Sequence, residues 1–175
     1  MSKARGPGLV GRAVRGAIAG AVGTAAMDLL LYVRYRRGGG KDPFLRWEFA
    51  GGVMGWADAS APGQLGEKVE RAVTGREPPE RWARTTTNVV HWATGMGWAA
   101  QYGVLAGRSP SHPVIRGLVL GPVVWLSGYV ILPLAGVYKP IWEYDAGTLA
   151  DDLSAHLVFG VTTSATYAAL MRRGT

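Results

Sequence analysis

Apolar residues gather in four long stretches of the chain, and polar connections separate them. The third stretch, Gly117 to Tyr138, runs for 22 residues without a single Asp, Glu, Lys, Arg or His. A helix of that length, rising about 1.5 Å per residue, crosses the roughly 30 Å hydrocarbon core of a bilayer. The pattern predicts an all-α integral membrane bundle of four transmembrane helices that forms one membrane domain, residues 1–175. The predicted spans are about 16–33, 85–106, 117–138 and 152–171.

The polar connection at residues 34–83 is the longest in the chain. Three consecutive glycines, Gly38 to Gly40, are expected to end the first helix. Aromatic residues within 44–56 are typical of a segment at the membrane interface. Apolar residues recur at helical spacing between Pro62 and Val73, with charged residues between them, which predicts a short amphipathic helix. We therefore expect one or two interfacial helices in this loop before Pro78-Pro79 starts the second span.

Basic residues surround the first span, and a secretory signal peptide is the competing interpretation of this region. The apolar run continues to Val33 and then meets three arginines, which favours a retained anchor. The basic residues before the span are Lys3, Arg5, Arg12 and Arg15, and those after it are Arg34, Arg36 and Arg37.

Four spans place both termini on one side of the membrane. The tails and the short loop on that side are purely basic, with Arg108 and Arg116 in the loop and Arg172 and Arg173 at the end. The other side carries ten Lys and Arg between residues 34 and 84, so the count alone nearly balances. The positive-inside rule gives acidic residues little weight, and the purely basic segments favour cytoplasmic termini in a bacterial inner membrane.

Composition adds two constraints. The chain has no cysteine, which excludes disulfides and thiolate chemistry. Its net charge of +7 is expected to face lipid headgroups, because no basic stripe interleaved with aromatics suggests nucleic acid. The expected partners are the lipid bilayer and, as an open alternative, other membrane proteins or a second copy. Small residues at four-residue spacing in every span predict a tight bundle: Gly16/Gly20, Gly95/Ala99/Gly103, Gly117/Gly121 and Gly160/Ser164/Ala168.

Three of the spans carry an ionisable residue at a similar depth: Asp28, His91 and His156. Counted from the acidic side, all three are expected about 6 to 11 Å inside one leaflet. A carboxylate in hydrocarbon costs about 2.5 to 3.5 kcal/mol, so it normally faces the bundle interior and finds a partner. We expect Asp28 to pair with His91 or with His156. The other members of the predicted cluster are Asp152, four residues before His156, together with Tyr129 and Asn88.

Several roles for this cluster remain open from the sequence. It serves either to fasten helices together or to handle protons or an ion, since histidine titrates near neutral pH. A zinc or manganese site built from Asp28, His91, His156 and Asp152 is a further alternative, and a catalytic role is another. No cofactor is expected. The acidic loop around Glu143 is expected to be solvated rather than to attract cations. Four tryptophans are expected as interface anchors rather than a ligand cage: Trp47, Trp56, Trp82 and Trp142.

Short motifs in the second half of the chain resemble an uncharacterised family of small bacterial inner-membrane proteins. The resemblance covers mainly residues 85–171, about half of the chain. It implies a multi-span inner-membrane protein and no particular reaction, and it draws attention to His91 and His156. The motifs are His91-Trp92-x-x-Gly95, Tyr102-Gly103-Val104, Arg116-Gly117-Leu118-x-x-Gly121, Pro133-Leu134-x-Gly136, Trp142-Glu143-Tyr144 and Ser154-x-His156-Leu157-x-Phe159-Gly160.

The motifs of common enzymes are missing from the sequence, which favours a protein without catalytic activity. The Walker loop, the Gly-x-Ser-x-Gly elbow and His-Glu-x-x-His are all absent. The leading hypothesis is a membrane protein whose intramembrane Asp/His cluster handles protons or binds an ion. One alternative is a structural or adaptor subunit that packs against other membrane proteins through its small-residue faces. The other is an enzyme that acts on lipid at the interface with His91 or His156 as base.

Overall fold

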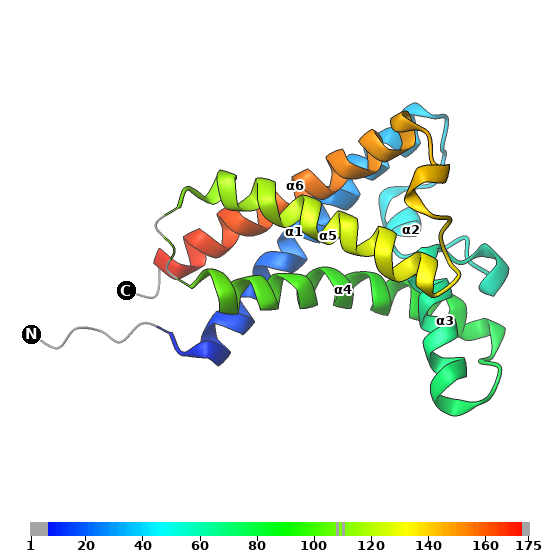
Figure 1. The fold of residues 1–175 in the computed structure, drawn as a ribbon. Coiled ribbons are helices and arrows are strands. Elements are labelled where there is room, and N and C mark those ends of the chain that lie inside the picture. Colours follow the sequence, from blue (N-terminus) through cyan, green and yellow to red (C-terminus); the bar gives the residue numbers. More distant parts are fainter. Residues whose placement is uncertain (1–6, 108, 110, 173–175) are drawn as a thin grey trace, which may run out of the picture. The chain divides into compact units, whose positions relative to one another are not determined.

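The computed structural model describes residues 7–107, 109 and 111–172, and all the regular secondary structure among them is helical, with no strand. Lys3, Arg5, Arg108 and Arg173 of the basic segments lie outside the described residues. Six α-helices follow one another within these described residues (Figure 1): α1 (Leu9–Arg37), α2 (Phe44–Glu48), α3 (Ala61–Thr74), α4 (Ala83–Ala106), α5 (Pro113–Leu134) and α6 (Ala146–Arg172). Three single 3₁₀ turns lie between them: Trp56–Asp58, Glu80–Trp82 and Ile141–Glu143.

The long helices α1, α4 and α6 contain the predicted spans 16–33, 85–106 and 152–171. The predicted end of the third span is wrong, because α5 ends at Leu134 rather than near Tyr138. Gly136 adopts the left-handed conformation (φ 66°) and donates its N–H to the Pro133 carbonyl at 2.9 Å. The next N–H, that of Val137, returns to the Leu132 carbonyl at 2.8 Å. This pair of bonds satisfies the last carbonyls of the helix, and a left-handed glycine makes it possible.

The glycines after α1 end that helix as predicted. Gly39 is left-handed (φ 93°) and donates to the Arg36 carbonyl at 3.2 Å. The N–H of Gly40 donates to the Tyr35 carbonyl at 2.9 Å. The chain therefore turns at once toward α2, which begins at Phe44.

The chain divides into two compact units, and the division falls within the long helices. Unit 1 comprises residues 1–27, 94–125 and 150–175, and unit 2 comprises residues 28–93 and 126–149. Each unit has its own set of buried apolar residues.

Unit 1 is built by close contact between α1 and α4. Gly16 faces the backbone of Ala99, and a side-chain carbon at Gly16 would collide with the Ala99 carbonyl. A Cβ at Gly20 would lie 2.7 Å from the carbonyl oxygen of Gly95. The two small-residue motifs predicted on these helices therefore pack against each other within the chain.

In unit 1, helix α5 packs against α6 in the same way. A Cβ at Gly121 would lie 2.5 Å from the carbonyl oxygen of His156, and one at Gly160 would collide with the carbonyl of Gly117. The buried face of α6 repeats every four residues, as expected for one side of a helix. That face consists of Ala155, Phe159, Thr163, Tyr167 and Met171, with Gly160 and Ser164 beside it.

Unit 2 joins the end of α1 to α2 through aromatic rings. The Tyr32 ring lies 5.1 Å from that of Phe44 and 5.4 Å from that of Trp47, measured between centroids. The Tyr32 hydroxyl donates to the Asp42 carbonyl at 3.1 Å, and the Tyr35 hydroxyl donates to the Asp42 carboxylate at 3.2 Å. These contacts fold α2 back along α1.

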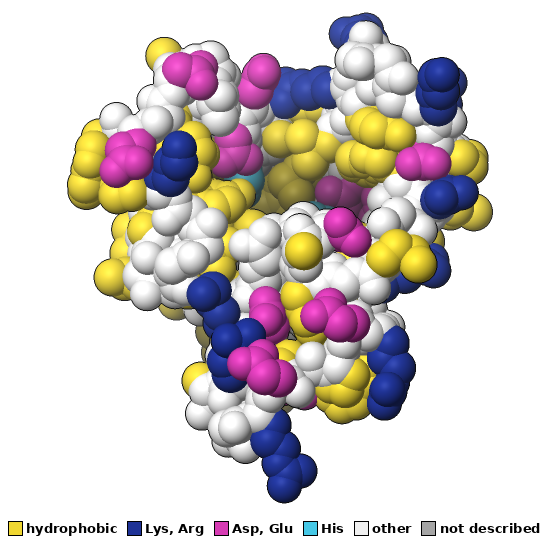
Figure 2. All heavy atoms as spheres, turned by 90° about the vertical axis from the view of Figure 1, so that its right-hand side faces the viewer, with side chains coloured by type: hydrophobic (Ala, Val, Ile, Leu, Met, Phe, Trp, Pro, Cys, Tyr) yellow, Lys and Arg dark blue, Asp and Glu magenta, His cyan; other side chains and the backbone are white. Residues whose placement is uncertain are grey.

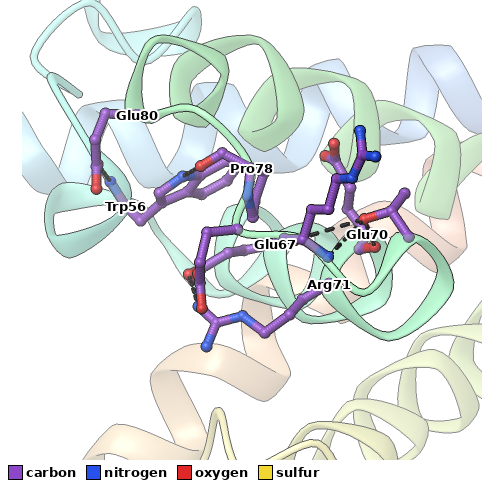
Figure 3. A network of polar contacts seen from close by, with 9 residues as sticks. Trp56, Glu67, Glu70, Arg71, Pro78 and Glu80 are labelled. Carbon is purple, nitrogen blue, oxygen red and sulfur yellow. Dashed lines mark hydrogen bonds and ion pairs between the residues drawn. The ribbon is translucent and has the colours of Figure 1, made fainter.

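Polar contacts close the loop around α3, also in unit 2 (Figure 3). The Trp56 indole donates to the Pro78 carbonyl at 3.0 Å, and its backbone N–H donates to Glu80 at 2.7 Å. Arg71 pairs with Glu67 at 2.7 Å within α3. The predicted amphipathic helix is confirmed, as α3. The prediction that Trp56 anchors the protein at an interface is wrong, because Trp56 is only 7% exposed.

Two helices, α1 and α5, are long and apolar enough to cross a membrane by length and composition. Helices α4 and α6 are long enough, with 24 and 27 residues, but they do not reach the same apolarity. On the face drawn in Figure 2, acidic and basic side chains stand among hydrophobic ones. That mixture contrasts with the purely basic segments near the termini.

Candidate functional site

Asp28 and His91 form a side-chain pair between α1 and α4, although 63 residues separate them in the sequence. His91 Nε2 lies 3.1 Å from one carboxylate oxygen of Asp28 and 2.9 Å from the other. A carboxylate only accepts hydrogen bonds, so we assign the proton to Nε2. Asp28 is only 3% exposed. Of the two partners that the sequence left open for Asp28, the structure provides His91.

Glu48, the last residue of α2, lies beside this pair, and sequence analysis did not single it out. Both of its carboxylate oxygens are buried, and the side chains of Asp28 and Trp92 lie near enough to act on the carboxyl group as hydrogen-bonding neighbours. Burial raises the pKa of Glu48 from an ordinary 4.5 to about 7, and the nearby Asp28 carboxylate raises it further while His91 opposes the shift. The signal was present, because Glu48 is the single acidic residue of the aromatic segment 44–56.

Two side chains of α4 hold the end of α2 next to this site. Arg84 Nε donates to the Phe49 carbonyl at 2.9 Å, and the Asn88 side-chain amide donates to the same oxygen at 3.2 Å. Phe49 directly follows Glu48. Asn88, predicted as a member of the cluster, therefore holds the backbone beside Glu48 instead of bonding to Asp28 or His91.

His156 and Asp152 form a separate pair on α6, within unit 1. His156 Nδ1 lies 2.9 Å from the backbone carbonyl of Asp152 and 3.3 Å from its carboxylate. The two side chains are 24% and 33% exposed, in contrast to the buried Asp28. The four-residue spacing that the sequence showed thus produces a contact within one helix.

Tyr129, the predicted contribution of the third span, belongs to an aromatic group in unit 2. Its ring lies 5.6 Å from that of Tyr138 and 5.4 Å from that of Tyr144. Tyr129 is 8% exposed. This packing joins the end of α5 to the connection that leads to α6.

A metal site would need several ligand side chains close together. Within residues 7–107, 109 and 111–172, no group of three or more His, Asp or Glu side chains is placed to hold a metal ion. What unit 2 does assemble is two carboxyl groups and one imidazole, of which one carboxyl titrates near neutral pH. A carboxyl group with this pKa can bind and release a proton near neutral pH.

Comparison of the whole chain with protein-family models, with curated proteins and with solved structures finds no match. The resemblance drawn from short motifs therefore stays a prediction.

Proposed function

We propose that the protein is a multi-pass membrane protein in which the carboxyl groups of Asp28 and Glu48, with the imidazole of His91, bind and release a proton near neutral pH. The observation that carries this proposal is the buried Glu48 carboxyl group, which lies beside the Asp28–His91 pair and interacts electrostatically with both of its members. Asp28 of α1, Glu48 of α2 and His91 of α4 are three titratable groups that lie close enough to interact.

The exposure of the apolar helices supports a membrane location. The core helix of a soluble protein is also long and apolar, but it is mostly buried. Of the 18-residue apolar segment that could cross a membrane, only 33% is buried in α1 and only 22% in α5. Large apolar side chains line the open face of α1 at four-residue intervals, where lipid would cover them: Val10, Val14, Ile18 and Val22.

The polar residues of α6 suit a span that other helices shield. Thr163 and Ser164 are fully buried in unit 1, and the Tyr102 hydroxyl lies 2.6 Å from that of Ser164. Polar groups that face the bundle interior are tolerated in a membrane, although they lower the average apolarity. We therefore retain α4 and α6 as the second and fourth spans of a four-span bundle. The basic tails favour cytoplasmic termini in a bacterial inner membrane.

In this proposal the Glu48 carboxyl group alternates between a protonated and an ionised form. Below pH 7 Glu48 is neutral and Asp28 keeps His91 as its partner. Above pH 7 the proton leaves and two carboxylates share one imidazole, which disfavours the position of α2. The His91 side chain is 28% exposed, so this group of side chains is accessible from outside the protein. This describes one-sided proton binding and not a path across the membrane.

The structure gives less support to the alternative that the protein is an adaptor subunit. Its small-residue faces were expected to stay open for a partner, but Gly16, Gly20, Gly117 and Gly121 pack against helices of the same chain. A partner would have to use the apolar faces of α1 and α5 instead.

Difference infrared spectroscopy of the full chain in lipid nanodiscs tests the proposal. We expect a protonated carboxyl band that disappears as the pH rises through about 7 and is absent from Glu48→Gln. Glu143→Gln is the matched control, because Glu143 is an exposed acidic residue of another loop, and the band should persist there. A band that titrates equally in Glu48→Gln would refute the assignment, and failure of the chain to insert into bilayers would refute the membrane location.

A further inference from the structure

Unit 1 contains a cleft where α5 begins and α6 ends, at the same end of the unit as the start of α1 and the end of α4 (Figure 1). Its volume of about 740 Å³ lies in the range of pockets that hold small molecules. Its lining includes Val114 and Arg116 from α5 together with Ala168, Tyr167, Met171 and Arg172 from α6.

Arg116 has an unusual environment in this cleft. Its Nε is buried and has no hydrogen-bond partner in the described part of the chain. A buried charged donor without an acceptor is costly. The acidic residues that unit 1 contributes within its described part are Asp151 and Asp152, which lie at the other end of α6 from Arg172.

Other cations gather around the same wall. Arg12 and Arg15 of α1, like Arg116, lie close enough to the Tyr167 hydroxyl to act on it electrostatically. Arg12 donates to the Val104 carbonyl and Arg15 to the Gly11 carbonyl, both at 3.3 Å. Carbonyl oxygens accept these hydrogen bonds but do not neutralise the positive charges. Three guanidinium groups therefore create a positive potential that an anion would relieve.

Part of the remaining lining is apolar, and Ser109, Ser111 and His112 add polar groups to it. Val114, Ala168 and Met171 line the cleft beside Arg116 and Arg172. An apolar wall next to guanidinium groups suits a ligand that has both a charged head and a hydrocarbon chain. Guanidinium groups match the oxygens of phosphate in geometry as well as in charge.

We infer that this cleft binds an anionic phospholipid, with its phosphate at Arg116 and Arg172 and its acyl chain along Val114 and Met171. The inference rests on the proposed location in a membrane. Basic pockets between membrane helices recognise anionic headgroups in this way. The site lies in unit 1 and involves none of the residues of the Asp28, His91 and Glu48 cluster.

Native mass spectrometry of the full chain, released from nanodiscs that contain equal phosphatidylglycerol and phosphatidylcholine, tests this site. We expect phosphatidylglycerol to be retained in preference to phosphatidylcholine, and Arg116→Gln to reduce that preference about tenfold. Arg172→Gln, which changes an exposed side chain, should give a loss in the same direction if Arg116→Gln fails to fold. Arg76→Gln is the matched control, because it removes one exposed positive charge from unit 2.

Each outcome has a definite meaning. Equal retention of the two lipids, or equal losses in Arg116→Gln and Arg76→Gln, would overturn the inference. Stabilisation of detergent-solubilised protein by inorganic phosphate as strong as that by phosphatidylglycerol would show that the ligand is free phosphate and would overturn the lipid assignment. Insertion into nanodiscs without lipid preference leaves the proposed function intact, whereas lipid preference with no titrating Glu48 band refutes only the proton site.

Discussion

In unit 1 the helices touch through glycines and backbone atoms, whereas in unit 2 short elements are joined by side-chain hydrogen bonds, ion pairs and stacked rings. At Gly16 and Gly121 the neighbouring backbone leaves no room for a side chain. At Asp28 and Phe49, contacts from α4 hold residues of α1 and of the segment after α2 in place. Backbone packing tolerates little change of volume, while side-chain contacts respond to charge and therefore to pH.

The largest effect should come from a single methyl group added in unit 1. Gly16→Ala places a Cβ against the Ala99 carbonyl, which is backbone and cannot rotate away. We expect the free energy of unfolding to fall by about 3 kcal/mol. Reversible unfolding in mixed micelles measures it. Gly97→Ala is the control, because a Cβ there meets no atom within 4 Å beyond its chain neighbours and the nearby backbone of its own helix, and alanine should stabilise α4 by about 0.5–1 kcal/mol. Equal effects at the two positions would contradict the close packing of α1 on α4.

A double-mutant cycle compares the two Asp–His pairs. Asp28→Asn and His91→Gln should show a coupling energy of about 2 kcal/mol, because the carboxylate is buried and accepts a charge-assisted bond. The same substitutions at Asp152 and His156 should couple by only about 0.3–0.5 kcal/mol, because that pair is partly exposed and lies within one helix. Similar coupling energies in both pairs would remove the energetic distinction between them.

The pH dependence of stability sharpens the role of unit 2. The folded chain holds a proton on Glu48 up to about pH 7, whereas in the unfolded chain Glu48 releases it near pH 4.5. The wild type should therefore lose stability as the pH rises from 4.5 to 7 and then level off. Glu48→Gln should remove that fall, so the variant is more stable than wild type at pH 8 and similar near pH 4.5. Thermal unfolding across this pH range tests it, and parallel curves for the two proteins would argue against the raised pKa.

The smallest effect concerns the residue that holds α2 in place. Asn88→Ala removes one hydrogen bond to the Phe49 carbonyl and should cost about 1 kcal/mol. It should also lower the pH at which the Glu48 carboxyl band disappears, because α2 then exposes Glu48 more often. Gln101→Ala is the control on the same helix, since the Gln101 side chain donates to the Gly97 carbonyl one turn earlier. An unchanged Glu48 transition in Asn88→Ala would mean that Asn88 does not position it.

Local patterns in the sequence were enough to predict the long helices and several of their ends. Apolar runs, the glycines after Arg37 and the spacing between Pro62 and Val73 all act over a few residues, so they can be interpreted without knowing the fold. The end of α5 was missed because Gly136 lies inside an uncharged run that looked continuous.

For the candidate site too, some features follow from local sequence and others depend on the fold. The depths of Asp28 and His91 along their spans identified both as candidates, because a charged group in hydrocarbon needs a partner. Which histidine serves Asp28 depends on how α1 rotates against α4, and sequence periodicity does not determine that rotation. Burial of Trp56 likewise depends on contacts with Pro78 and Glu80, more than twenty residues away.

The sequence by itself determined that this protein is helical, where its helices run and which ionisable residues lie inside them, because helix formation is governed by neighbours three and four residues apart. Only the tertiary structure decided that Glu48 joins Asp28 and His91, and that Arg116 lines a cleft with Arg172. These groups meet because α2 folds back on α1 and because α5 packs on α6. Contacts between such distant segments are determined by tertiary packing and not by the pattern of neighbouring residues.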